Sequence, residues 1–347
     1  MRRKIALLLV MWLVAGTTMA QTAKGIAELS SHSGADREQI LIEGAKKEGA
    51  LTLYTSIAQK DLPPLITAFE KKYGIKVQVW RAGSDKVLQR TLTETAGKRF
   101  EVDAVHIGAP ELHALHLEKV LQPVSSPAFK ALLAGAVPAH REWVATRLTV
   151  FVQAYNTNLV KKDELPKTWQ DLADPKWKGK LGIEFTDDDW FYILVQQLGE
   201  KRGLKLFRDI VAANGLSVRK GHSLLTNLVV SGEVPMALTV YSYMAEALKK
   251  RGAPIDWFVL EPAITRANGV AIARQAPHPH AALLFYDYVL SEEAQKILLS
   301  MDYIPTNATV ESPLKHMQLK VNNADLAPTE AEKWTRLYQE IISAGPR

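Results

Sequence analysis

The chain has 347 residues, of which 47% are hydrophobic and 23% are charged, and its formal net charge is +6. This length exceeds what one hydrophobic core usually organises, so we expect two α/β-sized units. The Lys and Arg residues are interspersed with carboxylates, which is typical of solvated helix faces and does not indicate nucleic-acid binding. The absence of cysteine excludes disulfides and a cysteine nucleophile.

The first twenty residues predict a signal peptide. Arg2, Arg3 and Lys4 form a basic start. The apolar segment that follows, residues 5–14, is too short to span a bilayer, and Ala20 closes a small-residue cleavage pattern. We therefore expect cleavage after Ala20, so that residues 1–20 are removed and the mature protein lies in the periplasm.

Predicted strands and helices alternate in the first third of the mature chain. The strands are expected over 51–55, 76–80 and 102–107. This alternation predicts right-handed βαβ units with a parallel sheet, in which ligands bind at the carboxyl ends of the strands. The candidate binding residues at these ends are Thr55, Ser56, Arg81, Gly83, Ser84 and Gly108.

Arg81 and Ser84 are the candidate anion-binding pair. Arg81 follows the second strand, and Ser84 opens the next predicted helix just after Gly83. An arginine beside a helix N-terminus suits a carboxylate or a phosphate. The alternative interpretation is an ordinary surface arginine.

The pattern changes at residues 143–157, where a long alternating strand predicts a crossing into a second domain, with a return crossing over 257–273. Helices over 280–299 and 330–344 are expected to pack back on the first domain. The predicted division is domain I from residues 21–148 and 268–347, and domain II from residues 149–267.

The most specific segment of the second domain covers residues 167–190. Thr168 followed by Asp171 predicts a capping box, and Pro175 should end that short helix. Residues 181–185 alternate as a half-buried strand does.

An acidic triplet follows this strand: Asp187, Asp188 and Asp189. The three aspartates either cap the next helix or face a ligand that carries a cation or an ammonium group. Trp190 comes next and either stacks on the ligand or belongs to the core.

Tyr241 and Tyr243 follow a later predicted strand of the second domain, residues 236–240. Either they line the binding cleft or they pack in the interior.

Five segments, taken in order, resemble the periplasmic solute-binding proteins of ABC importers, in particular the ferric-iron type. They read KKEGALTLYTS, FVQAYNTN, DLADPKWKGKLGI, SGEVPMAL and DYIPTNA. The resemblance implies an α/β protein with the two-domain periplasmic binding fold (type II-like), whose ligand cleft lies between domains joined by two crossing strands. It implies hinge closure near residues 152–156 and 265–270 around a small solute, which is delivered to a membrane permease.

The resemblance also bears on the ligand. The four metal-binding positions of the iron-type members correspond to Ala58, Gly108, Ser242 and Tyr243, of which only the tyrosine matches, while Tyr241 is one residue out of step. The acidic triplet occupies the place where those members hold a helper anion, which it would repel. We therefore favour a small organic anion or zwitterion.

The alternative ligand is a ferric or other metal ion held by Tyr241, Tyr243 and Asp187. A partner role with a sensor kinase is a further alternative. An enzyme is disfavoured because the sequence has no GxSxG elbow, HExxH motif, P-loop or dinucleotide fingerprint. We expect a monomer that carries no cofactor and binds no nucleic acid.

Overall fold

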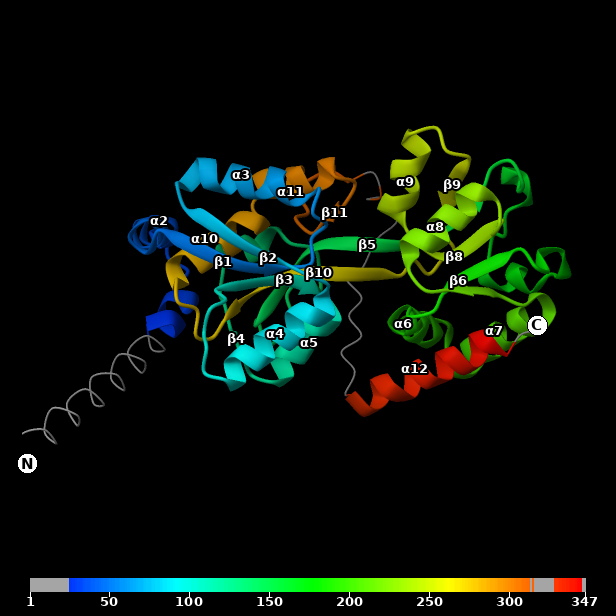
Figure 1. Ribbon diagram of the computed structural model, residues 1–347, viewed down its shortest axis with the longest axis horizontal. Coiled ribbons are helices and arrows are strands. Elements are labelled where there is room, and N and C mark those ends of the chain that lie inside the picture. The colour runs from blue at the N-terminus through cyan, green and yellow to red at the C-terminus, as the bar shows by residue number, and fades with distance from the viewer. Residues whose placement is uncertain (1–24, 313, 315–327, 345–347) are drawn as a thin grey trace, which may run out of the picture. The chain divides into compact units, whose positions relative to one another are not determined.

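The computed structural model describes residues 25–312, 314 and 328–344, so the predicted signal peptide lies outside the described residues. The described chain forms two compact units. Unit 1 holds the described residues up to Arg147 together with Asn268–Leu298 and Pro305–Val310. Unit 2 holds Leu148–Ala267, Leu299–Ile304 and the described residues from Glu311 onward (Figure 1).

The sheet of unit 1 is built from three parallel strands and one antiparallel strand, in the order β2-β1-β3-β10. β1 pairs in parallel with β2 and β3, as the alternating pattern predicts, whereas β10 runs antiparallel to β3 and also pairs with β4. The strands are β1 (Ala50–Thr55), β2 (Lys76–Arg81), β3 (Ala104–Gly108), β4 (Leu121–Gln122) and β10 (Thr265–Ala273).

Helices surround this sheet. They are α2 (Arg37–Glu48), α3 (Leu62–Tyr73), α4 (Ser84–Ala96), α5 (Ala109–Leu117), η1 (Pro127–Ala131), α10 (Pro279–Leu290) and α11 (Glu292–Ser300). Gly49 and Gly74 end α2 and α3 in the left-handed conformation, which explains why the chain can turn directly into β1 and β2. The helices α4 and α5 lie side by side (Figure 1). Their N-termini therefore open close together.

The long strand β5 (Trp143–Asn156) and β10 each contain a boundary between the two units. This agrees with the expectation of two crossing strands. All fourteen residues of β5 are buried, including the polar side chains of Arg147, Gln153 and Asn156.

The sheet of unit 2 combines parallel and antiparallel pairs. β8 runs antiparallel to β5 and parallel to β6, β6 pairs in parallel with β7, and β9 lies antiparallel on β5. The strands are β6 (Leu181–Glu184), β7 (Ser217–Arg219), β8 (Met236–Tyr241) and β9 (Ile255–Phe258), and the short β11 (Ile304–Pro305) pairs with β5. The helices are α6 (Asp188–Leu198), α7 (Glu200–Asn214), α8 (His222–Ser231), α9 (Ser242–Lys250) and α12 (Pro328–Ser343).

The segment before β6 folds as 3-10 turns: η2 (Lys162–Glu164), η3 (Trp169–Ala173) and η4 (Pro175–Trp177). The predicted capping box is confirmed, since the Thr168 hydroxyl accepts the Asp171 amide and the Asp171 carboxylate accepts the Thr168 amide. Pro175 cannot donate a backbone hydrogen bond, and the first short helix ends before it.

The C-terminal helix α12 packs on α6 and α7 of unit 2 (Figure 1). Trp334 and Tyr338 meet the Phe191 ring at 6.0 and 5.2 Å, and both side chains are buried. The sequence predicted this segment as part of domain I. The spacing of its apolar residues shows that the helix has a buried face, and it does not show which domain covers that face.

In the part of the chain that the structure describes, no helix is long and apolar enough to cross a membrane.

Candidate functional site

In unit 1, three strands end at the same level. Thr55 of β1 lies opposite Arg81 of β2 and opposite His106 of β3. The predicted binding residues therefore gather at one edge of the sheet, where parallel strands present ligand sites. Thr55 itself is buried, and its hydroxyl donates to the His106 carbonyl at 2.9 Å. Its contribution is to join β1 to β3.

Ser84 connects the loops that follow these strands. Its Oγ lies 3.0 Å from the Ser56 hydroxyl and accepts the Gly108 amide at 3.2 Å. Residues from the ends of β1, β2 and β3 thus meet at one hydroxyl group. This is the arrangement that the sequence predicted for these side chains.

Arg81 is exposed at the end of β2. Its Nε donates to the Ile57 carbonyl at 3.2 Å, which holds the guanidinium against the loop that follows β1. The guanidinium is therefore held at the loop that carries Ser56 and Ile57. An arginine fixed in this way suits a carboxylate or a phosphate-like group.

The helices α4 and α5 begin at Gly83 and Gly108, and neither glycine can cap its helix with a side chain. The Asp85 and Glu111 carboxylates lie over these starts, each 2.6 Å from where a Cβ would stand on Gly83 and Gly108. The edge of the sheet thus combines an arginine and hydroxyls with two carboxylates. Such a set can contact both an anionic and a cationic group.

His106 lies behind this edge and is buried. Burial lowers its pKa to about 3, and the Arg147 charge acts in the same direction. The ring is therefore neutral near pH 7. Its Nε2 lies 2.7 Å from the Thr146 hydroxyl, which itself donates to the Asn268 carbonyl at 3.2 Å.

In unit 2, the acidic triplet is engaged by partners from other elements. Asp187 is fully buried, and both its oxygens lie within 3.1 Å of His222 Nε2. Arg266 Nη2 approaches the same carboxylate at 3.5 Å. Asp187 also stands at the N-cap position of α6, but its side chain accepts no capping hydrogen bond.

Asp189 pairs with Arg266 through both carboxylate oxygens. Arg266 Nε donates to Asp189 Oδ2 at 2.8 Å, and Nη2 donates to Oδ1. Arg266 Nη1 also donates to the Tyr241 hydroxyl, and the guanidinium lies 5.0 Å above the Phe151 ring. Arg266, which lies on β10, thus supplies a positive charge to Asp187 and Asp189.

The other two predicted residues of this segment have structural partners. Asp188 Oδ2 accepts the Thr335 hydroxyl of α12 at 2.8 Å. Trp190 is buried against Trp169 and Phe207, with ring centroids 5.6 and 5.8 Å apart. Its contacts are those of a core side chain.

The titration of this cluster follows from its burial. Burial raises the pKa of Asp187, and the His222 and Arg266 charges oppose this change. Burial likewise raises the pKa of Asp188, against the Thr335 hydrogen bond. The pKa of Tyr241 is raised by burial too, so its phenol stays protonated at physiological pH.

Tyr241 and Tyr243 form part of an aromatic row. The His222 and Tyr241 rings stack with centroids 3.9 Å apart, and Tyr243 follows at 5.9 Å. The Tyr241 hydroxyl is directed into the Arg266 network, whereas Tyr243 lies against Tyr303 at 5.2 Å and lines a pocket.

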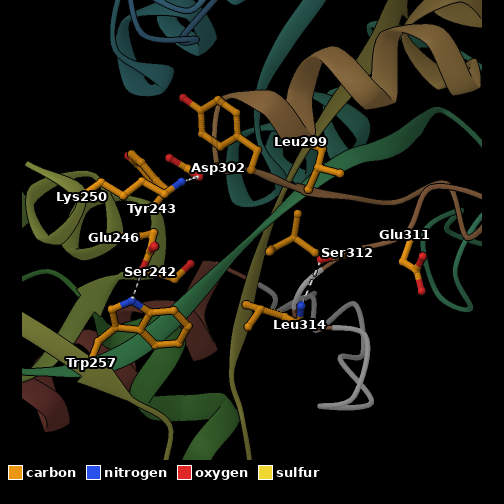
Figure 2. Close-up of a pocket in the computed structure, with 12 residues that line it drawn as sticks. Ser242, Tyr243, Glu246, Lys250, Trp257, Leu299, Asp302, Glu311, Ser312 and Leu314 are labelled. Carbon is orange, nitrogen blue, oxygen red and sulfur yellow. Dashed lines mark hydrogen bonds and ion pairs between the residues drawn. The ribbon is translucent and has the colours of Figure 1, made fainter.

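This pocket has a volume of about 730 Å³, within the range of small-molecule sites. Figure 2 shows Trp257 at one side with its Nε1 donating to Glu246, and Lys250 paired with Asp302 at another. Its lining belongs to unit 2 and comprises Ser242, Tyr243, Glu246, Lys250, Trp257, Leu299, Asp302, Tyr303, Ile304, Glu311, Ser312 and Leu314.

Sequence reasoning missed three residues of the unit 2 cluster: Glu184, His222 and Arg266. Glu184 accepts the Gly221 amide at 2.8 Å and the Thr186 hydroxyl at 2.8 Å. Arg266 and Asp189 are 77 residues apart, so no local spacing links them. The one signal in the sequence was electrostatic, because three adjacent carboxylates at a strand end need a compensating cation.

Among the residues that the structure describes, two groups of side chains have donor atoms close enough together for a metal ion. Glu184, Asp187 and His222 form the first, and His116, His140 and Glu142 form the second. In the first group, Arg266 already supplies a positive charge to Asp187.

The fold and the strand-end sites define a class of protein, the two-domain periplasmic binding proteins. The crystal structure of iron-bound HitA from Pseudomonas aeruginosa superposes with a TM-score of 0.72 at 23% identity and covers 84% of this chain and 99% of that one. At this identity the likeness establishes the fold.

The chain belongs to the bacterial extracellular solute-binding protein family, whose model matches residues 64–324. It is similar to the iron uptake protein A1 of Synechocystis, with 24% identity over 82% of this chain and 85% of that protein. It is also similar to a putative 2-aminoethylphosphonate-binding periplasmic protein of Salmonella typhi, with 23% identity over 72% and 75% of the two chains. One relative is named for iron uptake and the other for periplasmic binding, and the family is the solute-binding type that the sequence predicted.

Proposed function

We propose that this protein is the substrate-binding component of an ABC importer whose solute is a small organic anion or zwitterion. Proteins of this class bind a small solute and deliver it to a membrane permease. In this proposal Arg81 and Ser84 take the anionic group, and the signal peptide is cleaved after Ala20 on export to the periplasm.

The observation that carries the proposal is the Ser84 hydroxyl. It joins Ser56 and the Gly108 amide at the point where the ends of three strands meet, with Arg81 fixed beside it. Hydroxyls, amides and an arginine are hydrogen-bond donors, and the groups that accept from such a set are carboxylates, phosphates and phosphonates.

The carboxylates of Asp85 and Glu111 extend the proposal to zwitterions. They lie over the starts of α4 and α5, next to the donors. An ammonium group placed there would meet two negative charges while the anionic group of the same ligand meets Arg81. The name of the Salmonella typhi relative specifies an aminophosphonate, a ligand of this chemical kind.

Unit 2 supports the same preference. Asp187 and Asp189 already share the positive charge of Arg266, so a cation would have to compete with this arginine for their carboxylates. The raised pKa of Tyr241 opposes formation of the phenolate that ferric iron prefers.

Ferric or other metal-ion binding is the second candidate. Its support is the row of Tyr241 and Tyr243 beside Asp187, together with the iron-uptake name of the Synechocystis relative. A metal ion there would have to displace Arg266 from Asp187 and Asp189, and the phenol proton of Tyr241 would have to leave. Each of these steps costs free energy that an organic ligand at Arg81 does not require.

A thermal-shift panel on the dialysed mature protein tests this proposal. The probes are 2-aminoethylphosphonate, small carboxylic acids, inorganic phosphate and ferric citrate. A ligand at one hundred times its Kd stabilises the folded state by about 2.7 kcal/mol, which a thermal scan detects. The proposal requires a shift with at least one organic anion or zwitterion, and a shift with ferric citrate alone would contradict it.

Calorimetry on the strongest probe then locates the site. Removing the charge-assisted contact in Arg81→Ala is expected to weaken binding about tenfold to a hundredfold. The matched control is Arg99→Ala, which removes an exposed arginine of the same unit just beyond the other end of α4. Equal affinities of the two variants would refute the role of Arg81.

A further inference from the structure

A second constellation of ligating side chains lies in unit 1 and takes no part in the proposed solute site. It consists of His116 on α5 together with His140 and Glu142 from the segment that leads into β5. One ligating atom of each residue lies within 4.8 Å of those of the other two. We propose that these three residues form a site for a divalent transition metal ion of the zinc type.

The geometry brings the donor atoms to one place. His116 Nδ1 lies 2.9 Å from Glu142 Oε2, and His140 Nδ1 accepts the Glu142 backbone amide at 3.0 Å. The two imidazole rings stack with centroids 3.7 Å apart and an interplanar angle of 12°. The His116 ring therefore contacts the Glu142 side chain and the His140 ring contacts the Glu142 backbone amide, so both rings lie against the same residue.

The distances suit a small ion with little rearrangement. Two ligands held about 2.1 Å from a tetrahedral zinc ion stand about 3.4 Å apart. His116 Nδ1 and Glu142 Oε2 need to separate by only about half an ångström from their present contact to admit the ion.

The residues around these three side chains also favour metal binding. Glu142 is 11% exposed in its side chain, and Arg274 Nη2 donates to its second oxygen at 3.3 Å, which fixes the carboxylate. Outer contacts of this kind orient metal ligands. The same arginine adds a positive charge that limits affinity, and its side chain is 40% exposed, so solvent screens part of that charge.

The donor set selects the metal class. Two imidazoles and one carboxylate suit zinc and its neighbours nickel and copper, and they suit ferric iron less, because ferric iron prefers several anionic oxygens. Three protein ligands leave a fourth position for water, and the cysteine-free chain supplies no competing thiolate. This site is thus chemically distinct from the solute site at Arg81 and from the tyrosine row in unit 2.

The test is calorimetric titration of the chelator-treated mature protein with ZnCl₂. We expect one zinc ion per chain, because the three donor atoms form a single cluster. His116→Ala and His140→Ala should each weaken this binding at least tenfold. The controls are His32→Ala, which removes an exposed histidine paired with Asp36, and His222→Ala, which breaks the other candidate group.

Two outcomes would overturn the proposal: no zinc binding by the wild-type chain, or binding that is lost in His222→Ala and retained in His116→Ala. NMR spectra of the histidine side-chain nitrogens give a second readout on the unaltered protein. Zinc should shift the Nδ1 resonances of His116 and His140. Shifts confined to other histidines would refute the assignment without relying on any variant.

Discussion

Arg266→Ala is the most informative substitution in unit 2. The wild-type guanidinium pairs with both oxygens of Asp189, approaches Asp187 at 3.5 Å and donates to the Tyr241 hydroxyl. The substitution leaves Asp187, which is fully buried, with the His222 imidazole as its remaining side-chain partner. It also removes the guanidinium from the face of Phe151.

The magnitude follows from burial. Removing one member of a buried ion pair costs about 3–5 kcal/mol, because the other charge stays behind without compensation. The side chains of Arg266 and Asp189 are 21% and 19% exposed, so water recovers part of this loss. We therefore expect the free energy of unfolding to fall by about 3 kcal/mol, the lower end of that range.

Urea denaturation at pH 7, followed by tryptophan fluorescence, measures this change. Arg219→Ala is the matched control in the same unit, since its pair with Glu233 at 3.2 Å is exposed and is expected to be worth less than about 1 kcal/mol. The loss in Arg266→Ala should shrink as the pH is lowered, because protonation removes the uncompensated charges. Equal losses in the two variants, or a loss that does not change with pH, would refute the reasoning.

Three further predictions follow from the structure. Gly269→Ala should destabilise unit 1 by more than about 1 kcal/mol, because a Cβ there would stand 2.4 Å from the Val144 carbonyl oxygen; a thermal scan that matches wild type would contradict this. Stability should fall as the pH drops below about 6.5, because in the folded state the pKa of His106 is lowered to about 3, so the unfolded chain binds the proton at a higher pH. His106→Gln should remove part of this acid sensitivity in urea titrations. A rise in pH above about 4 should lower the stability, because the raised pKa of Asp188 means that the folded state binds this proton more tightly than the unfolded state does. Asp188→Asn should remove part of this loss, and an unchanged pH profile would contradict the prediction.

Local patterns in the sequence predicted the strand ends of unit 1. Thr55, Arg81 and Ser84 each follow a short apolar strand and precede a helix start, and parallel pairing then places them at one edge. The capping box of Thr168 and Asp171 was equally readable, since both partners lie within one turn.

The sequence was less informative wherever a partner is distant along the chain. The acidic triplet was recognised as unusual, but Arg266 lies on the return strand and His222 opens a helix, and no spacing rule connects either to Asp187. The same limit applies to α12, whose apolar face was predictable although its packing on α6 was not. For Trp190, the sequence left open whether the side chain stacks on the ligand or belongs to the core. In the structure it is buried against Trp169 and Phe207, as a core side chain is.

The pocket beside Tyr243 could not be predicted from the sequence either. Its lining comes from α9 and β9 and from two segments near residues 300 and 312. None of these segments carries a recognisable ligand-binding motif, and the hollow arises only when they are folded together (Figure 2).

The most direct test of the central claim is a calorimetric titration of the dialysed mature protein with 2-aminoethylphosphonate and, separately, with ferric citrate. The account predicts saturable one-to-one binding of the aminophosphonate or of another small organic anion from the panel. That binding should weaken at least tenfold in Arg81→Ala and stay unchanged in Arg99→Ala. Tight binding of ferric iron alone, lost in Tyr243→Phe and unaffected by Arg81→Ala, would contradict it.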